Sequence, residues 1–393
     1  MTGPAAAMPP GPPGRLAVRR LALTEFRCYA TLRLEVGPGP VVLTGPNGAG
    51  KTNLLEALSL LVPGRGLRRA GTGELTRQQA APGAAWAVSA RIEDETGPVE
   101  IGTGRDPGGD RRVVRIDGRN ARLADLAGRM AALWLTPAMD RLFSEGSGGR
   151  RRFLDRLAFG LDPGHAAEAA GYDQAMRERA RLLRAARDDG RPADPAWLAA
   201  LEQGMARHGA RLAANRLAIA ARLDRACRDG IGPFPAARLA VEGEVEGWLA
   251  AGLDAEAAEE RMRTALRAAR PRDQAAGATT FGPHRSDLAV RHAARDIPAA
   301  QGSTGEQKAV LVAIVLAQGR VLAAEGGRRP LLLLDEVAAH LDRERRAALF
   351  DELCALGAQS WLTGTDAPLF EAFGARAQFF RVADASVEPG NGV

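Results

Sequence analysis

Lysine is nearly absent from this chain of 393 residues. Lysine and arginine together number 53, and only Lys51 and Lys308 are lysine, so the other 51 are arginine. This skew indicates a composition that uses arginine wherever either cation serves. Arginine is a wide planar fork and lysine a compact charge on a flexible stem, so a tight phosphate cradle can accept lysine and reject arginine. Both lysines are therefore candidate phosphate contacts. The alternative is that these two positions remain lysine by chance, and for Lys308 this explanation is as good as a phosphate contact.

Cysteine is scarce, and long apolar runs are missing. Cys28, Cys227 and Cys354 lie far apart and form no CxxC pair, which argues against a disulfide framework or a zinc site. Apolar runs such as residues 310–317 are much shorter than the roughly 18 residues of a membrane helix. Residues 1–14 are rich in Pro, Gly and Ala without a cationic start, which predicts a disordered tail and no signal peptide. These absences predict a cytoplasmic protein without a membrane partner.

The remaining composition is that of a globular protein. Hydrophobic residues make up 46% and charged residues 25%. The length suits two average domains, or one domain with a large insertion. A net charge of +6 permits a polyanionic partner without requiring one.

A glycine-rich octapeptide carries the first strong functional signal. It fits the P-loop pattern G-x-x-x-x-G-K-[ST] and consists of Gly45, Pro46, Asn47, Gly48, Ala49, Gly50, Lys51 and Thr52. An aliphatic strand is predicted at 41–44 and an amphipathic helix at 52–62, the context that distinguishes a P-loop from an ordinary turn. The pattern predicts ATP binding, with Lys51 on the β- and γ-phosphates and the Thr52 hydroxyl on Mg²⁺.

An aliphatic run followed by two acids supplies the second signal. Leu331 to Leu334 predicts a central parallel strand, and Asp335 and Glu336 follow it directly. A carboxylate at that strand end can hold Mg²⁺, which assigns Asp335 to the metal, and Glu336 can act as the catalytic general base. An acidic cap after a core strand is the alternative. It loses weight because Ala339-His340-Leu341-Asp342 stands where ABC ATPases carry their D-loop.

The third signal is the heptapeptide Gly302-Ser303-Thr304-Gly305-Glu306-Gln307-Lys308. A serine followed by small residues at a helix start can form an anion site, and in ABC proteins such a signature completes the ATP site of the opposite subunit. Alone, the segment is a weak signal and could be a simple helix N-cap. Together with the two preceding motifs, it predicts an ABC signature at Ser303 and Gly305.

The predicted fold class is α/β: an ABC-type ATPase head, a mixed sheet with a P-loop, interrupted by a mostly helical arm. We expect the head at 15–145 and 276–393 and the arm at 146–275, because residues 150–270 have helical composition. Further strands are expected at 15–24, 31–36, 85–92, 112–116, 132–135, 278–290 and 360–362, and a helix at 309–323. Leu198, Met205, Leu212 and Ile219 recur every seven residues, but the accompanying positions turn polar, which predicts a short hairpin or small bundle.

These motifs together resemble the RecF family of ABC/SMC-type DNA-repair ATPases. The resemblance extends over nearly the whole chain, through 23–29, 45–53, 66–70, 150–156, 282–288, 303–308, 333–342 and 363–366. It implies a homodimer formed on ATP, binding to gapped or duplex-adjacent single-stranded DNA, cooperation with RecR and RecO in loading recombinase, and a role in DNA damage and the SOS response. It also implies ATP contacts at Arg27, Asn53 and Asp342.

Two departures from transporter ATPases suggest slow hydrolysis and an ATP-timed clamp. Thr365 stands where a switch histidine is expected, and no glutamine follows the strand at 132–135. His284 could serve the nucleotide or brace a loop. Near the P-loop, four arginines could follow DNA phosphates or form a solvated face: Arg65, Arg68, Arg69 and Arg77.

Two other functions fit the motifs less well. In a transporter ATPase subunit the two Walker motifs would be closer than the 284 positions between residues 51 and 335, with the arm between them. A structural SMC-like ATPase would require much longer heptad runs than those found here.

Overall fold

The structure is a computed structural model that describes residues 16–94, 97–188, 190, 192–326 and 329–390. The predicted tail at 1–14 lies outside these residues. The chain divides into two compact units: unit 1 is Met1–Met139, Gly232–Phe234 and Val315–Val393, and unit 2 is Asp140–Ile231 and Pro235–Ile314.

Unit 1 contains an antiparallel sheet of six strands in the order β2-β1-β4-β5-β6-β7. The strands are β1 (Ala17–Phe26), β2 (Tyr29–Glu35), β4 (Trp86–Asp94), β5 (Gly97–Arg105), β6 (Arg112–Ile116) and β7 (Arg119–Ala121). In β4, buried side chains alternate with more exposed ones, as expected of a strand with one face on a core. The sequence analysis did not predict β5 or β7.

The second sheet of unit 1 is mainly parallel, in the order β15-β14-β3-β13-β12-β8. Its strands are β3 (Val41–Thr44), β8 (Ala132–Leu135), β12 (Leu331–Leu334), β13 (Ser360–Gly364), β14 (Gln378–Ala383) and β15 (Ser386–Pro389). Only β15 pairs antiparallel, with β14. Because β3, β13 and β12 are parallel neighbours, the loops after their carboxyl ends meet at one edge. The sequence analysis missed β14 and β15.

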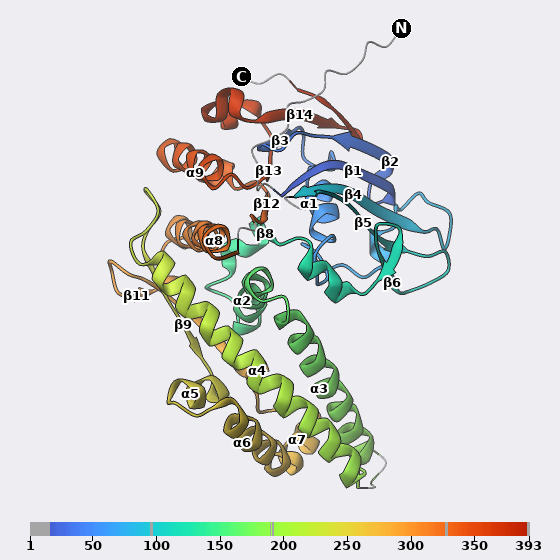
Figure 1. Cartoon of the computed structure of the whole chain (residues 1–393), viewed down its shortest axis with the longest axis vertical. Helices are drawn as coiled ribbons and strands as arrows, with labels where there is room; N and C mark the ends of the chain where they lie inside the picture. Colours follow the sequence, from blue (N-terminus) through green and yellow to red (C-terminus); the bar gives the residue numbers. More distant parts are fainter. Residues whose placement is uncertain (1–15, 95–96, 189, 191, 327–328, 391–393) are drawn as a thin grey trace. The chain divides into compact units, whose positions relative to one another are not determined.

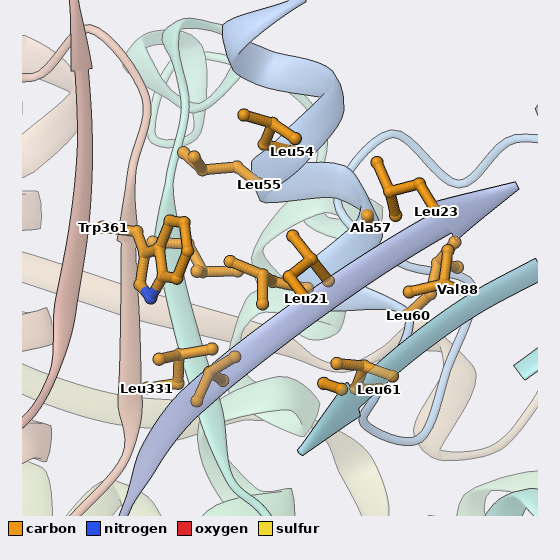
Figure 2. Close-up of a cluster of buried hydrophobic side chains, with 14 of the residues drawn as sticks. Leu21, Leu23, Leu54, Leu55, Ala57, Leu60, Leu61, Val88, Leu331 and Trp361 are labelled. Atoms are coloured by element: carbon orange, nitrogen blue, oxygen red, sulfur yellow. The ribbon is translucent and has the colours of Figure 1, made fainter. Parts of the chain in front are cut away.

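One hydrophobic cluster joins both sheets to helix α1 (Lys51–Ser59). Figure 2 shows Leu54, Leu55 and Ala57 of α1 among side chains of β1, β12 and β13, with Leu21, Leu331 and Trp361 close together. All six are fully buried. This packing fixes the helix that follows the P-loop against the strands that carry the neighbouring loops.

Unit 2 is mostly helical. Its helices are α2 (Ser147–Leu161), α3 (His165–Asp188), α4 (Pro195–Cys227), α5 (Glu244–Ala250), α6 (Ala255–Ala268) and α7 (Arg270–Ala276). A small antiparallel sheet of β9 (Ala237–Glu242), β10 (Asp287–His292) and β11 (Ile297–Pro298) accompanies them. Strand β9 was not predicted, and it lies within the residues 150–270 whose composition is mainly helical. The strand expected at 278–290 begins only at Asp287, after a loop and a 3₁₀ turn.

The sequence predicts that residues 276–314 belong to the head, whereas in the structure they are part of unit 2. The physical reason is the pairing of β10 with β9 along the whole strand, from Asp287 opposite Glu242 to His292 opposite Ala237.

The pair α3 and α4 forms the elongated part of unit 2, and the two helices run side by side in Figure 1. The heptad positions Leu198, Met205, Leu212 and Ile219 are all buried. A buried ion network accompanies this apolar seam: Arg179 contacts Glu202 at 3.0 Å and Asp273 at 2.7 Å. Such charges tolerate burial because each is paired.

Two further helices and several 3₁₀ turns complete the fold of the described residues. Helix α8 (Thr304–Gly326) begins in unit 2 and ends in unit 1, and α9 (Arg343–Leu356) lies in unit 1. The turns are η1 (Gly73–Leu75), η2 (Leu123–Gly128), η3 (Pro137–Arg141), η4 (Pro283–Arg285), η5 (Ala299–Gln301), η6 (Ala338–His340) and η7 (Ala367–Arg376).

Helix α8 is long and apolar over most of its length. By length and composition, Thr304–Ala324 could cross a membrane, with a mean hydropathy of 1.4, although no uninterrupted apolar run reaches that length. However, 72% of this apolar window is buried inside the structure, as in the core helix of a globular protein.

Candidate nucleotide site

The loop between β3 and α1 has a backbone that requires glycine at two positions. Gly45 has a φ of 149°, and a Cβ there would lie 2.0 Å from the carbonyl oxygen of Val382. Gly50 has a φ of 110°, and a Cβ there would lie 2.6 Å from the hydroxyl of Tyr29. That hydroxyl donates to the carbonyl of Gly50 at 3.1 Å. The P-loop is thus packed against its neighbours in a conformation that other residues cannot adopt.

Lys51 is the first residue of α1, and its side chain lies against the loop. The residue is only 4% exposed, and Nζ donates to the carbonyl oxygens of Gly45 at 2.7 Å and Pro46 at 2.8 Å. Burial lowers the pKa of Lys51, while the nearby carboxylates of Glu336, Asp335 and Asp366 oppose that shift. The ammonium is therefore held at the loop by neutral carbonyls, which a phosphate could replace as partners.

Thr52, Asp335 and Thr363 meet at the carboxyl edge of the parallel sheet. The Thr52 hydroxyl donates to Asp335 Oδ1 at 2.9 Å, and the Thr363 hydroxyl donates to the same oxygen at 2.7 Å. The backbone N–H of Glu336 donates to the Thr363 hydroxyl at 3.0 Å. One oxygen of a carboxylate that is 5% exposed thus connects the P-loop helix with the ends of β12 and β13.

The donor set fits Mg²⁺, which prefers oxygen ligands and takes few from the protein when phosphates supply the rest. Thr52 and Asp335 present a hydroxyl and a carboxylate 2.9 Å apart. Within the described residues no cluster of three or more His, Cys, Asp or Glu could hold a metal alone. A metal here would therefore share its coordination with nucleotide and water.

Glu336 has an unusual backbone. Its φ is +54°, a left-handed value that costs energy for a residue with a Cβ, and its side chain is half-buried. The N–H bond to Thr363 holds this conformation. Strained residues cluster at functional sites, where surrounding contacts maintain a needed side-chain direction.

Two further predicted residues of unit 1, Asp342 and Thr365, lie at exposed turns, and a third, Asn53, lies in α1. Asp342 is the N-cap of α9 and accepts from the N–H of Arg345 at 2.8 Å. The hydroxyl of Thr365, the residue at the expected switch position, donates to Asp366 at 2.8 Å and is exposed. Asn53, one turn into α1, donates to the sulfur of Cys28 at 3.2 Å.

The predicted signature lies in unit 2 and has the geometry of a capping box. Ser303 N–H donates to the Glu306 carboxylate at 2.8 Å, and Glu306 N–H donates to the Ser303 hydroxyl at 3.3 Å. Gly305 has no atom within 4 Å of an added Cβ, so it is open to solvent. The structure therefore shows the helix cap, and the cap occupies the N–H groups of Ser303 and Glu306 at this helix start.

The second lysine has a protein partner. Lys308 is 5% exposed, and Nζ lies 3.4 Å from the carboxylate of Asp140. The presence of lysine at this position of an arginine-rich chain therefore has a structural reason in this buried pair, alongside any phosphate role.

The arginines near the P-loop are largely engaged with protein. Arg27 binds the buried carboxylate of Glu56 with two bonds of 2.6 and 2.8 Å. Arg68 donates to Asn53 at 2.8 Å and contacts Glu56 at 3.4 Å. Arg77 pairs with Glu25 at 2.8 Å. Arg65 and Arg69 are exposed, and Arg69 has a left-handed φ of 59°.

His284 lies in unit 2, where both of its ring nitrogens have partners. Nε2 donates to the carbonyl of Thr279 at 2.9 Å, so Nδ1 accepts from the Tyr172 hydroxyl at 2.7 Å. Burial lowers the pKa of His284, although the bond to Thr279 opposes the shift. This neutral, doubly bonded ring favours the loop-bracing interpretation.

Sequence reasoning did not assign roles to Thr363 or Glu56. Thr363 ends a short strand whose neighbours could not be known from the chain. Its signal would have been the parallel pairing of β13 with β3 and β12, which places the three strand ends together. Glu56 has no local signal beyond an acid on an otherwise buried helix face.

Comparisons with known proteins agree on one relationship. A family model described as "RecF/RecN/SMC N terminal domain" matches residues 17–385. The chain is 51% identical over 380 residues to the DNA replication and repair protein RecF of Caulobacter vibrioides, covering 94% of this chain and 97% of that protein. It is 49% identical to the protein of the same name from Rhizobium meliloti, covering 95% and 99%.

Solved structures show the same fold. A recombination mediator protein RecF of the RecFOR pathway, described with ATPrS, superposes with a TM-score of 0.82 at 22% identity, covering 96% of this chain and 98% of that chain. An Smc head domain from Pyrococcus furiosus, bound to the C-terminal domain of ScpA, gives a TM-score of 0.54 at 16% identity, covering 95% of both chains.

Proposed function

The chain belongs to the RecF family of DNA replication and repair proteins, and we propose that it is an ATP-dependent clamp that acts on gapped DNA. The observation that carries the proposal is the shared Asp335 oxygen, which joins the P-loop hydroxyl of Thr52 to the ends of β12 and β13. This arrangement supports binding of a nucleoside triphosphate with its metal. It also aligns Glu336 beside the same phosphate-binding edge.

The residues of unit 1 suggest a division of roles. The P-loop N–H groups and Lys51 would bind the phosphates, at the N-terminus of α1 where the helix dipole favours anions. Thr52 and Asp335 would hold Mg²⁺, which supplies charge neutralisation on the phosphates when bound. Glu336 would accept a proton from the attacking water, a contribution typically worth about 10²–10⁴ in rate.

We place Ser303 and Gly305 in the ATP site of a second copy of the chain. Their turn is exposed, and its helix start offers N–H groups to an anion. Asp342 lies on an exposed turn after the catalytic strand and would meet the partner at the same interface. ATP would then hold two protomers together, and hydrolysis would release them.

The DNA and protein partners follow from the family. RecF relatives are named as DNA replication and repair proteins, and the solved relative is assigned to the RecFOR pathway. We therefore propose DNA, RecO and RecR as partners, and a cytoplasmic location. Among the candidate DNA contacts, Arg65 and Arg69 are exposed, whereas Arg68 is partly committed to Glu56.

ATPase assays with and without DNA test this function. We expect slow turnover that rises with gapped or duplex DNA, and DNA affinity that falls steeply with salt and depends little on sequence, because contacts to phosphates release counterions. Turnover that ignores DNA of every form, or strong sequence preference at high salt, would contradict the proposal. The relatives give no support to the alternative of a transporter ATPase subunit. Each is named a DNA replication and repair protein and matches this chain over nearly its whole length.

A further inference from the structure

Glu56 is a buried carboxylate beside the nucleotide site that the proposed mechanism does not use. It lies on α1, in the turn after Lys51 and Thr52, and it is 1% exposed. A carboxylate in such a position is costly to bury unless cations and hydrogen-bond donors satisfy it. Two arginines from different segments of unit 1 do so here.

Arg27 is the tighter of the two partners. Nε and one terminal nitrogen bind the two Glu56 oxygens at 2.8 and 2.6 Å, a bidentate geometry. The other terminal nitrogen donates to the carbonyl of Glu74 at 2.8 Å, and the Arg27 backbone N–H donates to Leu75 at 2.9 Å. Arg27 also has a left-handed φ of 55°. Its guanidinium is therefore fixed from several sides.

Arg68 is held more loosely than Arg27. It is 43% exposed, contacts Glu56 at 3.4 Å, and donates to Asn53 at 2.8 Å. Asn53 directly follows Thr52 in the first turn of α1, so this arginine is bonded to the helix that follows the P-loop. The segment that carries Arg68 is itself anchored, because Leu67 N–H donates to the Ser59 hydroxyl at 2.7 Å.

We propose that Glu56 is a positioning residue of the nucleotide site, whose carboxylate fixes the guanidinium groups of Arg27 and Arg68 beside the P-loop helix. Two cations share one anion, so one positive charge remains on this side of α1 in addition to Lys51. That surplus suits a polyphosphate ligand. Its placement depends on Glu56, since neither arginine has another carboxylate partner among the contacts of the described residues. The inference rests on the proposed ATP binding.

The Glu56→Gln variant separates positioning from simple electrostatics, because the two effects have opposite signs. Removal of a negative charge near the P-loop should, by charge alone, strengthen binding of ATP. If Glu56 positions the arginines, the same change should weaken it. Isothermal titration with Mg²⁺-ATP is expected to show at least a tenfold rise in Kd for Glu56→Gln.

Glu352→Gln is the matched control. Glu352 forms a bidentate pair with Arg320 at 2.6 and 2.7 Å, is 15% exposed, and belongs to the same unit. We expect it to leave the Kd for ATP unchanged. Urea unfolding of both variants identifies any general loss of stability.

Arg68→Met gives a second measurement, at a side chain that is itself largely exposed. It should raise the Kd for ATP severalfold, and the double variant Glu56→Gln/Arg68→Met should be less than additive, because both changes remove the same arrangement. A Glu56→Gln protein that is folded and binds ATP as well as wild type or better would overturn the proposal, as would full additivity. If wild type itself binds ATP no better than Lys51→Ala, then the proposed function fails instead.

Discussion

Thr52 and Asp335 stand 283 positions apart in the chain, yet the hydroxyl of Thr52 donates a 2.9 Å hydrogen bond to Oδ1 of Asp335. The residues begin a helix and follow a strand, and both belong to unit 1. The long helical insertion between them in the sequence therefore does not separate the two parts of the nucleotide site.

Replacement of Lys51 by arginine should abolish most ATP turnover. The buried ammonium is held by two loop carbonyls, and a planar guanidinium has no equivalent compact geometry. We expect a loss on the order of 10²-fold, comparable with removal of one preorganised transition-state contact. Turnover by phosphate release and melting without nucleotide are the measurements. Wild-type turnover in this variant would exclude Lys51 as the phosphate lysine.

Glu336→Gln should retain ATP and metal binding while it loses the general base. We expect turnover to fall by about 10²–10⁴-fold. The ATP-bound dimer should then accumulate and appear in light scattering as a doubled mass. A variant that hydrolyses ATP normally would place the base elsewhere.

Glu336→Asn should stabilise the fold while it abolishes turnover. The φ of +54° is unfavourable for glutamate, and asparagine tolerates this region better. We expect the free energy of unfolding in urea to rise by about 0.5–1 kcal/mol, a fraction of the usual cost of such strain. Equal or lower stability would show that Glu336 makes compensating contacts.

Ser303→Asp distinguishes a signature from a helix cap. Aspartate caps a helix as well as serine, so the capping contribution to stability should persist. Its charge would repel the γ-phosphate of a partner, and we expect near-normal ATP affinity without dimerisation or hydrolysis. Normal hydrolysis would reduce Gly302 to Lys308 to a cap.

Mixing Ser303→Asp with Lys51→Ala gives a sharper test of the dimer. In the heterodimer one composite site carries both lesions and the other carries none, so partial activity should return. If heterodimers form but stay inactive, either the arrangement in trans or the independence of the two sites is wrong.

Acid should destabilise the protein partly through Asp155. Burial raises its pKa, but the charge and hydrogen bonds of Arg216 and the contact with His165 outweigh burial and lower the pKa from 3.8 to about 2. Above pH 4 the ionised carboxylate therefore contributes about 2 kcal/mol to the free energy of unfolding. This contribution is lost as the pH falls from about 4 to 2. The Asp155→Asn variant should lose this pH dependence. Its free energy of unfolding at neutral pH should fall on the order of 3 kcal/mol, because Arg216 stays buried without its carboxylate partner. Urea unfolding at pH 3 and 7 measures both.

The parts of the site that sequence could predict are those with a local signature. The P-loop follows an aliphatic strand and precedes an amphipathic helix, and Asp335 follows four leucines, so both could be recognised from their neighbours. Thr363 and Glu56 could not, because their partners are distant in sequence and only the strand order and the arginine contacts give them a role. The strand β9 was hidden by helix-forming residues on both sides, and it forms because β10 pairs with it.

The arginine bias also determines how a protease would act on the folded protein. An endoproteinase that cleaves only after lysine has two target bonds, after Lys51 in the P-loop helix and after Lys308 beyond the signature. Both residues are at most 5% exposed, so cleavage requires local opening at one of these two motifs. The two cuts give fragments of distinct size. A lysine-specific digest with and without ATP therefore reports separately, without any added label, the local opening of the P-loop helix and of the proposed signature.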